Sequence, residues 1–238
     1  MLSYRLFQAG LFPFLPFLIA EAKAIRKSKP IPPAQSNHLI LGSGEKKLLI
    51  FGESTAAGVG ASKPEKTLAG QISIHFDQGY QVINLGKNGL QVKDFFNEFG
   101  AEISNLKGHV EGVFLFMGAN DCFRLTEPIK YKRLLLEIIN HFQKNFSPEW
   151  IYLAAIPPVN KFPAFSTWMQ FFLRNQRTFL TKKMEEIKEI YPNIIFEEID
   201  LKLSPEFFAS DGVHPSDIGY EAIAQFAIDG IKRWRNKV

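Results

Sequence analysis

Residues 47–60 read KLLIFGESTAAGVG, an apolar run that leads into a turn of small residues. The run Lys47–Phe51 is short and ends at a glycine, which is typical of a buried β-strand. Ser54 follows this strand where small neighbours let the backbone turn sharply and let a substrate approach closely. A serine in this position can act as a nucleophile, although it can equally be the N-cap of a helix. The stretch therefore predicts a strand-to-loop junction that carries one candidate site residue.

The chain after this stretch alternates short apolar runs with longer amphipathic ones. We expect strands at Lys47–Phe51, Gln81–Leu85, Gly112–Met117, Trp150–Ala154 and Ile194–Glu197. We expect helices at Thr67–Phe76, Val92–Ser104, Pro128–Asn145, Ser166–Tyr191 and Ser216–Lys237. Strands separated by helices of this length imply right-handed crossovers and a parallel sheet covered on both faces. Functional residues are then expected just beyond the carboxyl ends of the strands.

Asp211 and His214 lie close together near the end of the chain, in the run Ser-Asp-Gly-Val-His-Pro. A spacing of three within a turn lets the carboxylate reach one ring nitrogen while the other nitrogen faces a serine. A serine needs such a base, because its hydroxyl is a weak nucleophile until its proton is removed. The pair could also be a surface feature that caps the final helix, which Pro215 would start. Together with Ser54, the pair favours acyl transfer.

Two further loops follow predicted strands and contain possible hydrogen-bond donors. Gly89 could present its backbone N–H to a developing oxyanion, because no side chain blocks it. The Asn120 amide is a neutral donor that could point at the same place. Either residue could instead belong to an ordinary turn. Asp121 is expected to brace its loop, and Cys122, the one cysteine, is expected to be buried and excludes an intrachain disulfide.

Four sequence blocks resemble those of the SGNH hydrolases, also called GDSL esterases/lipases. They are Phe51-Gly52-Glu53-Ser54, Gly89 after Asn84, Gly118-x-Asn120-Asp121 and Asp211-x-x-His214-Pro215. The resemblance covers the chain from Lys47 to Val238. Glu53 stands where this family usually carries aspartate, and the Gly-Glu-Ser-Thr block resembles a bacterial subgroup of these esterases.

The resemblance implies a role for each candidate residue. Ser54 would be the nucleophile, His214 the base and Asp211 the acid that orients the base. The backbone amides of Ser54 and Gly89, with the Asn120 side chain, would form the oxyanion hole. The implied fold is a flavodoxin-like α/β protein, a three-layer α/β/α sandwich with a five-stranded parallel sheet. No metal or organic cofactor is implied.

The expected activity is that of a serine esterase or lipase that hydrolyses carboxylic esters through an acyl-enzyme. An aromatic cluster after the fourth strand could line an acyl pocket, or it could simply pack one helix face; it comprises Phe162, Phe165, Trp168, Met169, Phe171, Phe172 and Phe179. With the apolar N-terminus, this cluster favours medium- or long-chain acyl groups, including those of lipids. An acyltransferase using the same acyl-enzyme, a short-chain or carbohydrate O-acetylesterase, and a non-catalytic binding module are the alternatives.

Residues 1–29 combine an apolar run, Leu6–Ala20, with a basic cluster, and a proline-containing linker at 30–46 separates them from the domain at 47–238. Fifteen helical residues reach about 22 Å, short of a hydrocarbon core of about 30 Å. One interpretation is a short or interfacial membrane anchor with a basic collar, which would place the body on the cytoplasmic face. A signal peptide that exports the protein, or a segment packed on the domain's own surface, are the others.

The net charge of +4 belongs to the N-terminal segment. Residues 1–30 contain five basic side chains and one acidic side chain, so the remaining body is neutral overall. A neutral body without a basic stripe argues against nucleic-acid binding. The partners we expect are a small-molecule acyl ester and, through residues 1–29, a membrane surface.

Overall fold

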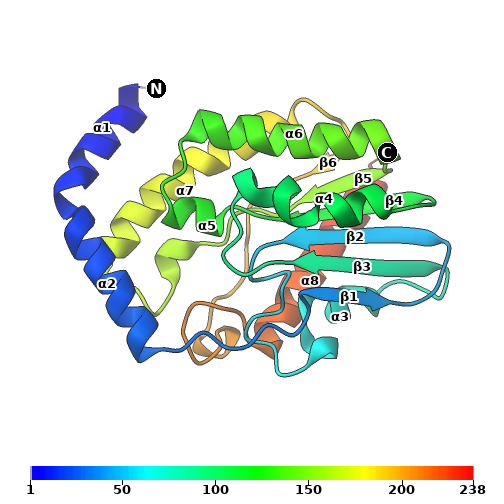
Figure 1. Cartoon of the computed structure of the whole chain (residues 1–238), viewed down its shortest axis with the longest axis horizontal. Coiled ribbons are helices and arrows are strands. Elements are labelled where there is room, and N and C mark those ends of the chain that lie inside the picture. Colours follow the sequence, from blue (N-terminus) through cyan, green and yellow to red (C-terminus); the bar gives the residue numbers. More distant parts are fainter. Residues whose placement is uncertain (1, 238) are drawn as a thin grey trace.

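A six-stranded sheet runs through the middle of the computed structural model, which describes residues 2–237 (Figure 1). In spatial order the strands are β1 (His38–Leu41), β3 (Tyr80–Gly86), β2 (Lys46–Gly52), β4 (Val110–Phe116), β5 (Trp150–Leu153) and β6 (Ile194–Ile195). The five strands from β2 to β6 are parallel, as expected for strands joined by helical crossovers. The carboxyl ends of β2, β3 and β4 therefore lie side by side at one edge of the sheet.

The prediction of a five-stranded sheet is wrong by one strand. β1 pairs antiparallel with β3 and comes from residues 30–46, which were expected to be a linker. Its four residues alternate between exposed and half-buried positions, a weak pattern close to three prolines. Pairing with β3 makes this segment a strand, and the added strand covers backbone groups that a free sheet edge would expose.

Helices cover both faces of the sheet, so the three-layer α/β/α architecture is confirmed (Figure 1). Leu48 of β2 packs towards one face, and its neighbour Leu49 packs towards the other, because successive side chains of a strand point to opposite sides. Both are fully buried, as expected for a parallel sheet with two covered faces. On the Leu48 side lie α3 (Leu68–Ser73) and α8 (Asp217–Arg235); on the Leu49 side lie α4 (Phe95–Asn105), α6 (Pro128–Phe146) and α7 (Thr167–Lys188).

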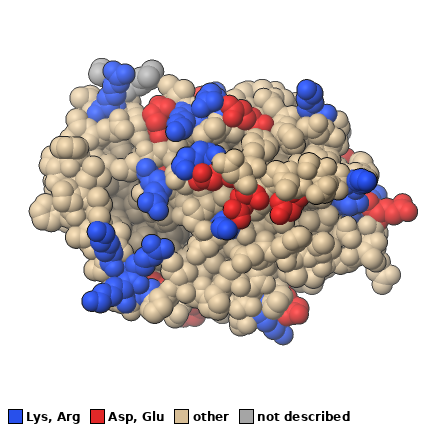
Figure 2. Space-filling view, viewed as in Figure 1, with Lys and Arg blue, Asp and Glu red and all other residues tan. Residues whose placement is uncertain are grey.

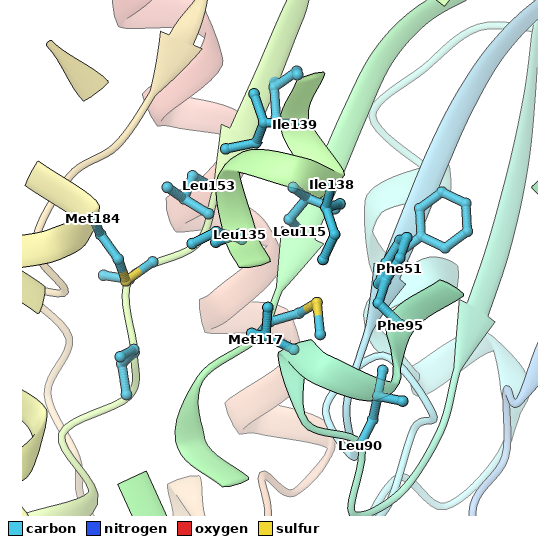
Figure 3. Close-up of a cluster of buried hydrophobic side chains, with 14 of the residues drawn as sticks. Phe51, Leu90, Phe95, Leu115, Met117, Leu135, Ile138, Ile139, Leu153 and Met184 are labelled. Carbon is cyan, nitrogen blue, oxygen red and sulfur yellow. The ribbon is translucent and has the colours of Figure 1, made fainter. Parts of the chain in front are cut away.

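The larger core cluster lies between the sheet and α4, α6 and α7 (Figure 3). Phe51, the last apolar residue of β2, contacts the rings of Phe95, Phe99 and Phe142 at centroid distances of 5.4, 5.5 and 5.2 Å. Aromatic contacts of this geometry add to the free energy of apolar burial. The strand that leads to Ser54 is therefore held rigidly in the core.

Short helical elements complete the chain and were not expected from the periodicity. They are α5 (Ala119–Phe123) and the 3₁₀ turns η1 (Phe12–Phe14), η2 (Pro64–Lys66), η3 (Val92–Asp94), η4 (Val159–Lys161) and η5 (Pro205–Phe207). Most of them follow strands or precede helices, where turn chemistry outweighs a periodic pattern. Several of these turns lie next to the candidate site.

The N-terminal segment consists of α1 (Leu2–Leu11), η1 and α2 (Leu15–Ser28) and lies outside the body against α7 (Figure 1). Phe14 stacks on Trp168 of α7 at a centroid distance of 5.6 Å. The Glu21 carboxylate accepts hydrogen bonds from the backbone N–H and hydroxyl of Ser166, each at 2.7 Å. Pro13 falls in the 3₁₀ turn, so the chain stays helical past it. By length and composition alone, Ser3–Ser28 could also cross a membrane.

Candidate active site

Ser54 lies in a tight turn at the carboxyl end of β2 and is half-buried. The Ala57 N–H donates to the Glu53 carbonyl at 2.9 Å, and the Val59 N–H donates to the Ser54 carbonyl at 3.1 Å. At the end of β3, a Cβ added to Gly86 would come within 2.2 Å of the Ala57 nitrogen. Only glycine permits this close approach. The end of β3 thus supports the turn that presents the serine.

Two loops far apart in the sequence contact each other: the serine loop (residues 54–62) and the histidine loop (residues 208–216). We call the contacts of Gly60 and Ser62 with Pro215, His214 and Asp217 the clasp between these loops. Gly60 has φ +98°, and a Cβ added there would lie 2.4 Å from the Pro215 carbonyl oxygen and 3.4 Å from the Cβ of His214. Asp217, the first residue of α8 directly after the histidine loop, accepts hydrogen bonds through its carboxylate from the Ser62 N–H at 2.8 Å and from the Ser62 hydroxyl at 2.6 Å. These contacts bring the two predicted halves of the site to one place.

Asp211 and His214 form the hydrogen-bonded pair that their spacing predicts. His214 Nδ1 lies 2.6 Å from Asp211 Oδ2, and Asp211 Oδ1 accepts the backbone N–H groups of Val213 and His214 at 3.0 Å each. Burial by itself would raise the pKa of Asp211. The hydrogen bonds from the His214 ring and from the two backbone groups outweigh burial and lower this pKa below its usual value. The carboxylate is therefore ionised and holds the imidazole in one orientation.

Glu53, directly before Ser54, has a buried side chain that holds the loop after β4. Its Oε1 accepts the Ala119 N–H at 2.8 Å, and its Oε2 accepts the Asn120 backbone N–H at 2.9 Å and the Asn120 Nδ2 at 2.6 Å. One of the two hydrogens on Nδ2 serves this bond, which leaves the other for a ligand. Burial raises the pKa of Glu53 to about 7, although the hydrogen bonds from Asn120 and Ala119 lower it.

The positioning role of Glu53 was missed by sequence reasoning, which treated the residue as a departure in a motif. The only local signal was a carboxylate next to the candidate serine in an apolar surrounding. Its partner, Asn120, lies 67 positions further along the chain, so spacing could not connect the two. The contact depends on the strand order, which places β2 beside β4.

Asp121 and Cys122 have the structural positions expected for them. Asp121 is buried and accepts the Val92 N–H at 3.0 Å and the Thr126 hydroxyl at 2.7 Å. Burial is the main reason that its pKa is raised. Cys122 is fully buried, and burial raises the pKa of its thiol well above the usual value. The thiol is therefore protonated and inert.

A cavity of about 570 Å³ is lined by all five predicted site residues: Ser54, Gly89, Asn120, Asp211 and His214. They reach it from the loops after β2, β3 and β4 and from the histidine loop. Gly89 has φ +83°, and a Cβ added there would meet no atom within 4 Å, so its backbone borders open space. This volume suits a small-molecule ligand.

Most of the cavity lining is apolar and comes from two regions (Figure 2 shows the hollow between the N-terminal segment and the body). From the body come Phe162, Phe165, Met169, Phe172, Leu173, Leu201 and Leu203, among others. From the N-terminal segment come Leu11, Leu15, Leu18, Ile19, Ala22 and Ile25. The body residues include four of the predicted aromatic cluster. The N-terminal contribution was not predicted, because nothing local indicates what a terminal helix packs against.

One potential metal-ligand group occurs within residues 2–237, formed by His109, Glu111 and Glu149, whose ligand atoms lie within 4.8 Å of one another. It lies at the amino end of β4, whereas Asn120 follows the carboxyl end. Glu111 already pairs with Lys46 at 3.0 Å and with Arg235 at 2.6 Å. Its charge is thus compensated by side chains of the protein.

The chain matches the model of the GDSL-like lipase/acylhydrolase family over residues 50–222, well over half of its length. It belongs to this family. It is accordingly a carboxylic ester hydrolase, and the match supports a general esterase role. The matched region contains the predicted site residues from Ser54 to His214.

Solved structures with a similar fold include a member of the lipolytic G-D-S-L family from Veillonella parvula, with a TM-score of 0.64 and 15% identity over 79% of this chain and 99% of that one. A psychrotrophic esterase from a Pseudoalteromonas species has a TM-score of 0.62 and 21% sequence identity, with 80% of this chain and 98% of that chain covered. An acetylxylan esterase from Geobacillus stearothermophilus has a TM-score of 0.58 and 21% sequence identity, with 80% of this chain and 95% of that chain covered. At these identities the likeness concerns the fold. A comparison with curated proteins found no match.

Proposed function

We propose that the protein is a serine esterase that hydrolyses carboxylic esters of medium- or long-chain acyl groups. The observation that carries this proposal is the short Asp211–His214 hydrogen bond in the same cavity as Ser54. A carboxylate that fixes one imidazole nitrogen leaves the other available as a base towards a serine. The clasp between the serine loop and the histidine loop keeps these groups together.

In the proposed mechanism the Ser54 hydroxyl attacks the ester carbonyl while His214 takes its proton. The resulting oxyanion accepts hydrogen bonds from the backbone N–H groups of Ser54 and Gly89 and from the free hydrogen of Asn120 Nδ2. Collapse of this intermediate breaks the acyl C–O bond, and His214 returns the proton to the leaving alcohol. Water then hydrolyses the acyl-enzyme by the same route. Each oxyanion donor contributes a factor of about 10²–10³ in rate.

The preference for longer acyl chains rests on the lining of the cavity. Apolar side chains from α7, from the loop after β6 and from the N-terminal segment enclose the space next to Ser54. Burial of each methylene group against such a surface contributes about 0.8 kcal/mol. An acetyl group would leave most of this surface without a contact.

Attachment to a membrane surface through the N-terminal segment is also part of the proposal. Leu6, Phe12 and Phe17 are 65%, 73% and 74% exposed on the outer side of α1, η1 and α2, and Trp168 of α7 is 64% exposed. Apolar side chains beside a basic cluster are typical of helices that lie in a membrane interface. The basic collar favours the cytoplasmic face. Export by a signal peptide would remove residues that line the cavity, which speaks for a retained segment.

The first test is labelling by a fluorophosphonate probe, which reacts with an activated serine and requires no knowledge of the substrate. We expect one adduct per chain, mapped to Ser54 by peptide mass spectrometry. Ser54→Ala should abolish both labelling and turnover of p-nitrophenyl octanoate, whereas Ser104→Ala, at an exposed position on α4 away from the cavity, should retain the label. Labelling that persists in Ser54→Ala would exclude this nucleophile.

A further inference from the structure

The cavity changes in character along α2, which forms its outer wall. Leu15 and Leu18, near the start of the helix, present apolar side chains to it. Lys23, Arg26 and Lys29, at the far end, also line it; we call these three residues the α2 cations. From Leu15 to Lys29 the wall extends about 20 Å at the helical rise per residue. Apolar side chains therefore line the whole wall, and the three cations are confined to its far end.

The α2 cations lack a counter-charge. Arg124 also lines the cavity, but it directly precedes Leu125, whose carbonyl accepts the Tyr4 hydroxyl of α1. Within residues 2–237, none of these four cations lies within 4 Å of a carboxylate oxygen. Asp211 is the one carboxylate in the lining, and it is bound to His214. Figure 2 shows Lys and Arg side chains gathered at the rim of the hollow, where Figure 1 places the end of α2.

The positive end is also the end near the candidate catalytic residues. A Cβ added to Gly212, between Asp211 and His214, would lie 3.4 Å from Lys29 Nζ. The cations therefore face the part of an ester that surrounds the scissile bond and its alcohol, while the apolar end is left for the acyl chain.

The helix macrodipole does not account for this placement. Basic side chains are favoured in the last turn of any helix, and both Arg26 and Lys27 lie there in α2. Both side chains are exposed, but Arg26 lines the cavity and Lys27 does not. Lys27 therefore shares the environment of the helix end without facing the cavity, which makes it a matched control.

We propose that the substrate is an acyl ester whose alcohol part carries a phosphate group. This inference rests on the esterase function proposed above. Lys and Arg side chains bind phosphate through charge-assisted hydrogen bonds, and the three α2 cations at one end of the cavity suit a group with more than one negative charge. The acyl chain lies along Leu15 and Leu18, and the phosphate lies among the α2 cations. Water adds across the acyl C–O bond, the phosphate ester stays intact, and the products are a fatty acid and a phosphoalcohol.

The test compares two soluble substrates of equal acyl length, octanoyl glycerol and octanoyl glycerol phosphate, both kept below the concentration at which they form micelles. Because both are monomeric, attachment of the protein to a surface does not affect the comparison. For the full-length protein we expect kcat/KM to be higher for the phosphate ester by about tenfold at low salt, and this preference should shrink between about 0.05 and 0.5 M salt as charges are screened.

The variant Lys23→Gln with Arg26→Gln and Lys29→Gln should lower this ratio of kcat/KM values to near one. Gln has nearly the same helix propensity as Lys and Arg, so α2 should stay intact, which circular dichroism checks. The control Lys27→Gln removes one charge from the same helix and should keep the wild-type ratio.

The two levels of the proposal fail in different ways. Equal kcat/KM for the two esters in the wild type, or a preference that survives in the triple variant, would overturn the phosphate inference and leave the esterase in place. Failure to hydrolyse either ester, together with failure of Ser54 to react with the fluorophosphonate, would overturn the function beneath it.

Discussion

Glu53 is a buried carboxylate whose protonation is linked to folding. Its pKa is raised to about 7, mainly by burial, from an ordinary value of 4.5. Between these two pH values the folded chain binds a proton that the unfolded chain has released. The free energy of unfolding therefore decreases as pH rises from about 4.5 to about 7. Below about 4.5 Glu53 is protonated in both the folded and the unfolded chain, so it causes no such loss.

Glu53→Gln should remove this pH dependence. Relative to the variant, the wild type should lose about 3 kcal/mol of unfolding free energy between pH 4.5 and pH 7.5, from the shift in pKa and its free-energy equivalent. Urea denaturation of both proteins at the two pH values measures the difference, and all other titrating groups cancel between them. A difference that stays constant with pH would show that Glu53 does not titrate in this way.

At the scale of elements, the clasp between the serine loop and the histidine loop depends on Gly60. Gly60→Ala would put a side chain on a residue with φ +98° and bring its Cβ within 2.4 Å of the Pro215 carbonyl. We expect the free energy of unfolding to fall by about 2 kcal/mol or more. Turnover should fall too, because the two loops are pushed apart.

Gly100→Ala is the matched control for Gly60→Ala. Gly100 lies inside α4, and a Cβ added there meets no atom within 4 Å. The same chemical change should therefore raise the free energy of unfolding by about 0.5–1 kcal/mol through helix propensity. Thermal unfolding with parallel esterase assays gives both results. Equal effects of the two variants would contradict the role assigned to Gly60.

A second prediction at this scale concerns α2 as one side of the acyl pocket. Leu15→Trp enlarges a side chain that lines the cavity. We expect kcat/KM for p-nitrophenyl dodecanoate to fall by about tenfold or more, because the larger side chain blocks a long acyl chain. We expect kcat/KM for p-nitrophenyl butyrate to change far less. Phe17→Trp changes the exposed side of the same helix and should leave the chain-length profile as it is. A chain-length profile unaltered by Leu15→Trp would mean that α2 does not border the bound acyl chain.

On the scale of the whole molecule, the most exposed aromatic side chains, Phe12, Phe17 and Trp168, belong to the N-terminal segment and α7, and this is the face expected to meet a membrane. Replacing Phe12 and Phe17 by serine should reduce partitioning onto anionic vesicles by about tenfold or more, because two aromatic side chains no longer enter the interface. The control is Ile74→Ser, which removes a side chain that is 72% exposed at the end of α3. Vesicle co-sedimentation measures the binding, and equal loss in both variants would argue against a defined membrane face.

Much of the body could be predicted from the sequence because its signals are local. The run from Lys47 to Phe51 and the Asp211–His214 spacing each describe a few neighbouring residues, and the parallel sheet then brings strand ends together. β1 was missed because pairing with β3, rather than its own pattern, makes it a strand. The contact of Glu53 with Asn120 was missed for a similar reason, because it joins loops after β2 and β4 that only the strand order makes neighbours.

The burial of Cys122 has a practical consequence for following motion in this protein. Its protonated thiol is sealed in the interior, and it is the one sulfhydryl in the chain, so thiol-reactive dyes should find no native target in the folded molecule. A cysteine introduced at Ala24, an exposed position on α2, would then carry a fluorophore alone. Its emission could report, in real time, whether the N-terminal helix stays against α7 or swings away when ligand or vesicles are added.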